Sequence, residues 1–185
     1  MKEIKSPCVI AIGSVSGGGK TTAVTQLLAK LPNSKALLFD DYEFAGPDDV
    51  LEWLDRGTDY EEWNLTPLLK DLEKLRSEPL DYILLDYPFA YQHSLISKFI
   101  DFAVFIDTPL DIALTRRMTR DFKSSSTEEI LLQMEHYATH GRKAYLEMLK
   151  TIKPNSDLIV DGALSTTNIT NLIIENIGTA RDLPQ

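Results

Sequence analysis

The sequence predicts an α/β domain built on a five-stranded parallel sheet with helices on both faces. The strand candidates are short, nearly continuous apolar runs, as expected for strands buried on both faces. They lie at residues 8–12, 36–40, 82–86, 102–107 and 157–161. Helical patterns alternate with them, at residues 20–31, 47–56, 66–77, 90–100, 109–122, 126–151 and 166–177. This alternation favours parallel strands joined by helical crossovers.

Two of these helices carry a start signal in the sequence. Thr66-Pro67 and Thr108-Pro109 each place a threonine, expected as the N-cap, before a proline in the first helical position.

Size and composition indicate one globular domain, spanning residues 1–185. The chain is 43% hydrophobic and 25% charged, which is ordinary for a soluble protein. No apolar run approaches the roughly 20 residues of a membrane span, and the first six residues are too polar to begin a secretory signal. Cys8 is the single cysteine, so a disulfide within the chain is excluded. We therefore expect a cytoplasmic protein without a membrane partner.

The formal net charge of −9 argues against a nucleic-acid partner, because polyanions bind basic surfaces. An acidic protein that holds a small anion needs a local set of cations instead. Lys20 is one candidate, and Arg116, Arg117 and Arg120 are three more that lie close together on one predicted helix.

The most specific motif is Gly17-Gly18-Gly19-Lys20-Thr21-Thr22, between the first predicted strand and the first predicted helix. Glycines let several N–H groups point at one anion, and the helix N-terminus adds a partial positive charge there. The lysine that follows can reach the β- and γ-phosphates, and the hydroxyl of the next residue can bind Mg²⁺. This order is that of a P-loop, although Ser14 stands where the full pattern has its first glycine. The predicted nucleotide-binding set is Ser16, Gly17, Gly18, Gly19, Lys20, Thr21 and Thr22, with Arg116 and Arg117.

A P-loop refines the predicted architecture to a P-loop NTPase three-layer sandwich, in which ligands bind beyond the carboxyl ends of the strands. Two aspartates stand at such ends. Asp40 could orient and deprotonate a phosphoryl acceptor, or it could simply cap a turn. Asp86 follows a strand in the Walker B manner, so Thr21 and Asp86 are the candidate ligands of Mg²⁺. Asp107 is more simply read as part of a turn that starts a helix.

Two further segments flank this predicted site. Residues 116–127 combine the arginine helix with a serine-rich turn, which suggests a small lid over the nucleotide. The segment at about 41–66 is rich in aromatic and acidic groups and could bind an acceptor. Its aromatic residues Trp53, Tyr60 and Trp63 could equally well pin a helix to the core. The candidate acceptor-binding residues are Asp40, Tyr42, Asp59 and Tyr60.

The chain resembles the uridine kinase-like family of P-loop kinases, which includes uridine-cytidine, nicotinamide riboside and pantothenate kinases. The likeness lies in Ser16–Thr22, Asp40–Tyr42, Leu114–Asp121 and Asp157–Gly162, in the family's order. The resemblance implies that Asp40 is the base for the acceptor hydroxyl, that Asp59 contacts sugar hydroxyls, and that Arg116, Arg117 and Arg120 belong to a lid. The third strand ends in Asp86-Tyr87-Pro88, where uridine kinases of the family typically have Glu-Gly, so the acceptor stays open.

The expected activity is transfer of the γ-phosphoryl group of ATP, with Mg²⁺, to a hydroxyl of a nucleoside-like or related metabolite. Asp40, Lys20 and Arg120 are the expected catalytic residues. Two rival functions stay open, an NTPase that acts without a small acceptor and a nucleotide-binding interaction protein without catalysis. The sequence leaves a homo-oligomer open as well.

Overall fold

The computed structural model describes residues 6–181, so most of the polar N-terminal stretch lies outside the described residues. One five-stranded parallel sheet forms its centre, in the order β2-β3-β1-β4-β5. The strands are β1 (Cys8–Gly13), β2 (Ser34–Leu38), β3 (Tyr82–Asp86), β4 (Phe102–Asp107) and β5 (Leu158–Asp161). The predicted fold class is confirmed. Within the described range, no helix has both the length and the apolar character needed to cross a bilayer.

The two faces of the sheet carry separate hydrophobic cores, because successive side chains of a strand point to opposite faces. In β1, Val9 and Ala11 pack on one face, and Ile10 and Ile12 pack on the other. All four side chains are fully or almost fully buried. Burial on both faces is why β1, β3 and β4 read as nearly continuous apolar runs, whereas most side chains of the edge strands β2 and β5 are half-buried or exposed.

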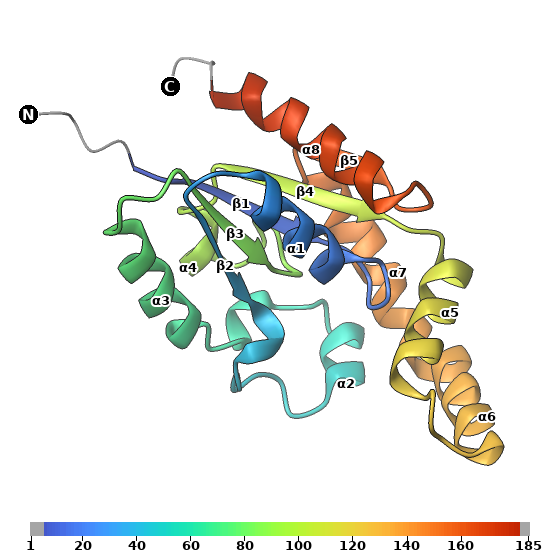
Figure 1. Cartoon of the computed structure of the whole chain (residues 1–185). Coiled ribbons are helices and arrows are strands. Elements are labelled where there is room, and N and C mark those ends of the chain that lie inside the picture. The colour runs from blue at the N-terminus through green and yellow to red at the C-terminus, as the bar shows by residue number, and fades with distance from the viewer. Residues whose placement is uncertain (1–5, 182–185) are drawn as a thin grey trace, which may run out of the picture.

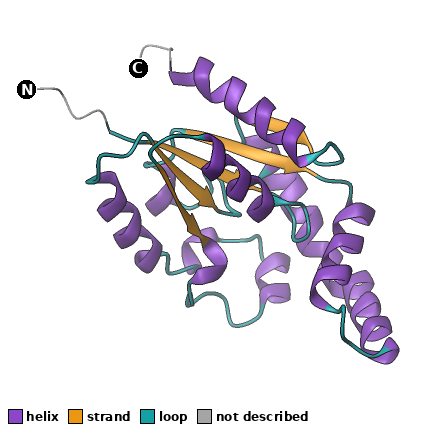
Figure 2. Cartoon of the chain, viewed as in Figure 1, coloured by secondary structure: helices purple, strands orange, loops and turns teal. Residues whose placement is uncertain are grey.

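Helices cover both faces, which gives three layers (Figure 1). α1 (Lys20–Lys30) and α8 (Thr166–Arg181) lie side by side on one face. The opposite core receives side chains from α3 (Thr66–Arg76), α4 (Ser94–Ser97) and the end of α7 (Arg142–Thr151). Figure 2 shows the strands enclosed between these helical layers.

Helix boundaries differ from the predicted ones where a local signal outweighs the apolar pattern. The predicted helix 90–100 is reduced to the four residues of α4, since Pro88 and the left-handed Ala90 (φ 45°) keep the preceding chain non-helical. The predicted helix 47–56 is α2 (Val50–Asp55), which begins late because the Asp49 side chain accepts hydrogen bonds from the N–H groups of Leu51 and Glu52.

The predicted helix 126–151 is continuous but not uniform. It consists of α6 (Thr127–His136), a π-helical turn at Tyr137–Gly141, and α7. Together with α5 (Leu110–Asp121), α6 projects away from the sheet (Figure 1). The serine-rich turn predicted after the arginines joins α5 to α6, and Ser126 caps α6 through a capping box with Glu129.

Both predicted threonine caps are displaced by one position. α3 begins at Thr66 itself, with Leu65 as its N-cap, and α5 begins after Pro109. Thr108 is therefore free for a tertiary contact, and its Oγ1 donates a hydrogen bond to the carbonyl of Gly18, 2.8 Å away. This contact ties the end of β4 to the P-loop.

Gly162, just after β5, lies directly against this threonine. A Cβ at position 162 would be 1.8 Å from Thr108 Oγ1 and 2.8 Å from its Cα. We expect Gly162→Ala to lower the free energy of unfolding by about 1–3 kcal/mol, because Thr108 and its backbone would have to shift. Urea unfolding measures the change.

Gly178, in α8, is the matched control, because a Cβ there would meet nothing within 4 Å. Gly178→Ala should raise stability by about 0.5–1 kcal/mol, through helix propensity. Equal effects of the two substitutions would contradict the packing argument.

Candidate active site

The loop between β1 and α1 makes a tight turn and lies close to α5. Gly17 has a φ of +79°, and a Cβ on it would lie 2.1 Å from the carbonyl oxygen of Ala113. Gly18 donates a backbone hydrogen bond to Val15, and Gly19 (φ +100°) is the N-cap of α1. Gly19 makes no side-chain cap, so N–H groups of the first turn of α1 stay available for an anion.

Ser14, the irregular position of the motif, is part of this geometry. Its side chain is 1% exposed and its hydroxyl donates to the carbonyl of Val15, 2.9 Å away. A Cβ on Gly18 would lie 2.5 Å from Ser14 Oγ. The serine thus fills the inside of the loop, and the glycine at position 18 leaves room for it.

Asp86 connects β3 to the start of α1. Its Oδ2 accepts a 2.6 Å hydrogen bond from Thr21 Oγ1, and its Oδ1 lies 3.2 Å from Lys20 Nζ. Asp86 is 3% exposed, so its charge depends on these two partners. Oδ1 accepts no hydrogen bond from the described residues.

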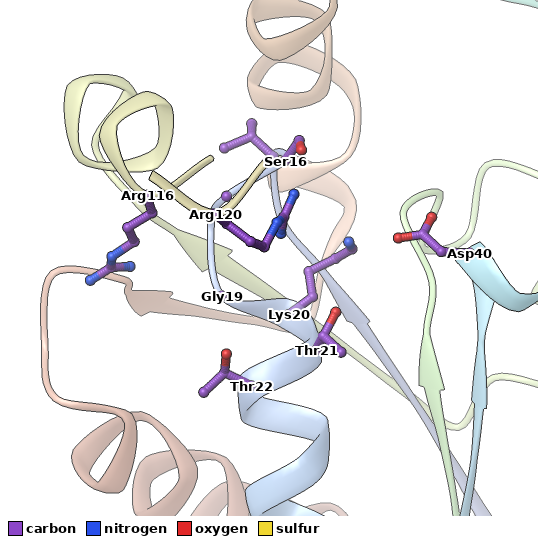
Figure 3. A pocket seen from close by; sticks show the side chains of 10 residues that line it. Ser16, Gly19, Lys20, Thr21, Thr22, Asp40, Arg116 and Arg120 are labelled. Atoms are coloured by element: carbon purple, nitrogen blue, oxygen red, sulfur yellow. The ribbon is translucent and has the colours of Figure 1, made fainter. Parts of the chain in front are cut away.

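A cavity of about 260 Å³ opens above the loop, and we call it the phosphate cavity. The P-loop forms its floor, with Ser16, Lys20 and Thr22 among the lining residues. Asp40 lines the cavity from the opposite side (Figure 3). The predicted strand 36–40 ends at Leu38, so Asp40 lies on a 3₁₀ turn, Phe39–Asp41, rather than on the strand.

The three arginines of α5 do not act alike. Arg116 and Arg120 line the phosphate cavity. Arg117 is not among its lining residues; it pairs with Asp121 at 3.8 Å and packs its stem near Gly17. Arg120 also binds Asp121, through two hydrogen bonds of 2.6 and 3.1 Å that lower the pKa of this carboxyl.

A second cavity of about 240 Å³ lies beside the first, and we call it the apolar cavity. Ser16 lines both cavities, so they adjoin at the P-loop. Aromatic and aliphatic side chains of the acceptor segment, of the turn after β3 and of α7 form its wall, among them Trp53, Tyr60, Phe89 and Met148.

The aromatic residues of the acceptor segment therefore divide between the two roles considered for them. Trp53 and Tyr60 are buried in the core and also line the apolar cavity. The Tyr60 hydroxyl is hydrogen-bonded to Thr151 Oγ1 at 2.9 Å, and burial raises its pKa. Trp63 packs on Phe39 and Phe89 and does not line the cavity.

Two predicted acceptor residues lie outside both cavities. The Tyr42 hydroxyl donates to Asp71 on α3, 2.9 Å away. Asp59 is exposed, and its carboxylate accepts from the N–H of Glu61 as a local cap.

Sequence reasoning missed the contribution of α7 to the site. Tyr145, Met148 and Ile152 line the apolar cavity together with Glu147. The spacing of three and four residues between the first three is the signal that could have indicated a common helix face. It could not have indicated what that face packs against.

Comparison with known proteins supports the predicted resemblance. No family model matches the chain. The chain is 24% identical to the uridine kinase of Streptococcus mutans serotype c, over 91% of this chain and 93% of the relative. It is 25% identical to the uridine kinase of Staphylococcus aureus strain Newman, over 85% and 88%.

Solved structures share the fold at lower identity. The deoxyadenosine kinase of M. mycoides with bound dATP matches with a TM-score of 0.52 and 18% identity, over 92% of this chain and 99% of that one. TT1252 from Thermus thermophilus matches with a TM-score of 0.54 and 15% identity, over 97% and 100%. The chain is thus similar to uridine kinases over most of its length, and it has the fold of these solved structures.

Proposed function

We propose that this chain is an ATP-dependent kinase that phosphorylates a hydroxyl of a small metabolite. One observation carries the proposal. The phosphate cavity places Lys20, Arg116 and Arg120 opposite the carboxylate of Asp40, and a second cavity adjoins it at Ser16. A site that only binds phosphate would need neither the opposed carboxylate nor the second cavity, and a site that hydrolyses ATP would have no need of the second cavity. The uridine kinases and the deoxyadenosine kinase named above support the same class of reaction.

The loop and the arginines would hold the triphosphate of ATP. N–H groups of the loop and of the first turn of α1 face the β- and γ-phosphates, and Lys20 neutralises their charge. Arg116 and Arg120 would approach the transferred group from α5. The segment 116–127 stays our candidate for the lid.

Asp86 at the end of β3 and Thr21 in the first turn of α1 fit Mg²⁺. Thr21 and Asp86 present the hard oxygen ligands that this ion prefers, and Asp86 Oδ1 accepts no hydrogen bond from the described chain. The described residues contain no group of three or more His, Cys, Asp or Glu able to hold a metal by itself, so the nucleotide would supply further ligands. When bound, Mg²⁺ would offset the charge on the β- and γ-phosphates.

Asp40 would act on the acceptor. Its carboxylate takes the proton of the acceptor hydroxyl as that oxygen forms a bond to the γ-phosphorus. The bond between the γ-phosphorus and the bridging oxygen breaks, ADP leaves, and Asp40 returns the proton to solvent. Lys20 and Arg120 stabilise the charge that spreads over the transferred group. We place this ATP-consuming reaction in the cytoplasm.

The acceptor and the role of Asp40 are tested together. A screen for ADP release over nucleosides, vitamin precursors and sugars identifies an acceptor. With that acceptor, Asp40→Asn should lower kcat about a hundredfold or more and leave ATP affinity unchanged, because the amide cannot take the proton. Lys20→Ala should lower both ATP affinity and turnover.

Asp41→Asn is the control for Asp40→Asn. Asp41 belongs to the same 3₁₀ turn and is exposed, but it does not line the phosphate cavity. The Asp41→Asn variant should therefore keep near-normal turnover. Normal turnover in Asp40→Asn would refute the assignment of Asp40 as the catalytic base. ATP hydrolysis that no acceptor accelerates would favour an NTPase.

Arg116 and Arg117 form a second matched pair, since only Arg116 lines the phosphate cavity. Arg116→Ala should weaken ATP binding about tenfold, the cost of one charge-assisted contact. Arg117→Ala should change it by less than about threefold, because its partner is Asp121 on the protein surface. Titration with a fluorescent ATP analogue measures both, and the reverse order would contradict the assignment.

A further inference from the structure

The apolar cavity carries one charged group, and its other lining residues are apolar or aromatic apart from Ser16. We infer that it takes a cationic group of the acceptor, with Glu147 as the counter-charge and the aromatic rings as the rest of the site. This inference rests on the proposed kinase function, because it assigns the acceptor's chemistry in the same site.

Glu147 is the one carboxylate among the residues that line the apolar cavity, and no lysine, arginine or histidine lines it. Its side chain is 19% exposed, and Oε1 accepts a 3.3 Å hydrogen bond from Thr58. Its cationic neighbour Lys150 stands 3.7 Å away with a side chain that is 77% exposed, outside the lining. Such a solvent-exposed ion pair contributes little free energy, so the carboxylate of Glu147 remains able to attract a cation from the cavity.

Four aromatic residues give the wall faces that suit a cation. Trp53 and Tyr60 meet edge to face, with centroids 5.3 Å apart and planes at 89°. Phe89 meets Tyr60 at 5.2 Å and 62°, and Tyr145 adds a fourth ring to the lining. These four rings all border the cavity, and an aromatic face attracts a cation through its quadrupole.

The hydrogen-bonding groups in the lining also favour a cationic group over a neutral base. The lining holds no asparagine or glutamine side chain that could read the mixed donor and acceptor edge of a neutral base. The Tyr60 hydroxyl is already paired with Thr151. Tyr145 is 5% exposed and its hydroxyl has no partner among the described residues, so it offers a donor for an oxygen of the acceptor, beside the hydroxyl of Ser16.

The test uses two primary alcohols of nearly equal shape, choline and its neutral isostere 3,3-dimethylbutan-1-ol, at constant ionic strength. Tryptophan fluorescence reports binding, because Trp53 lines the cavity. We expect choline to bind about tenfold more tightly than the neutral alcohol, as a desolvated cation–π and carboxylate site would provide. Equal or tighter binding of the neutral alcohol to the unmodified protein would overturn the inference.

Two variants locate the source of the preference. Glu147→Gln should reduce the preference for choline, because only the attraction of the aromatic rings then remains, while binding of the neutral alcohol stays unchanged. Glu135→Gln makes the same change of charge at an exposed position of α6 and should keep it. A preference for choline that Glu147→Gln leaves undiminished would also overturn the inference.

ADP release separates this inference from the kinase proposal. Selective binding of choline, with no ADP release for any alcohol of the wider screen, would refute the kinase function and leave the cation site standing. ADP release that favours neutral acceptors and is unaffected by Glu147→Gln would keep the kinase and refute the cation site.

Discussion

The contact between Asp86 and the start of α1 is the interaction on which the site depends. A charge that is 3% exposed at the end of β3, an inner strand of the sheet, must be paired, and Lys20 and Thr21 are its partners. The pairing fixes the first turn of α1 against the sheet. The glycine loop that precedes this turn is then held in one position relative to the neighbouring strand ends.

Contacts from neighbouring strands add to this arrangement. Thr108, just after β4, holds the loop through the Gly18 carbonyl, and the N–H of Gly162, after β5, donates to the carbonyl of Asp107. Each contact lies at the carboxyl edge of the sheet, where parallel strands all end. Asp40 follows β2 at the same edge, so the sheet itself sets a phosphate-binding side opposite a carboxylate.

The apolar cavity has a different origin. Its wall combines the segment between β2 and β3 with α7, which comes after α5 and α6 in the chain. Trp53 and Tyr60 serve both the core and the cavity, so the side chains that stabilise the fold also form the wall that we propose binds the acceptor. Changes to such residues would affect folding together with the shape of the cavity, whereas the contribution that we propose for Glu147 depends on its charge.

Local patterns predicted much of the fold and part of the site. The five apolar runs correspond to the five strands, and the glycine loop lies between β1 and α1 as its motif requires. The boundaries that failed did so where local chemistry outweighed periodicity, as with the Asp49 cap before α2. The sequence predicts Tyr42 and Asp59 as acceptor-binding residues. In the structure, the Tyr42 hydroxyl donates a hydrogen bond to Asp71, and Asp59 caps a 3₁₀ turn.

By itself, the sequence determined the parallel sheet, the P-loop and the aspartates at the strand ends, because these features are encoded by spacing along the chain. The tertiary structure alone decided that Arg116 and Arg120, but not Arg117, line the phosphate cavity, since their side chains leave α5 in different directions. It also brought Glu147 to the aromatic wall. Packing of distant segments, rather than any local pattern, forms such a cavity, so one sequence alone carries no direct sign of it.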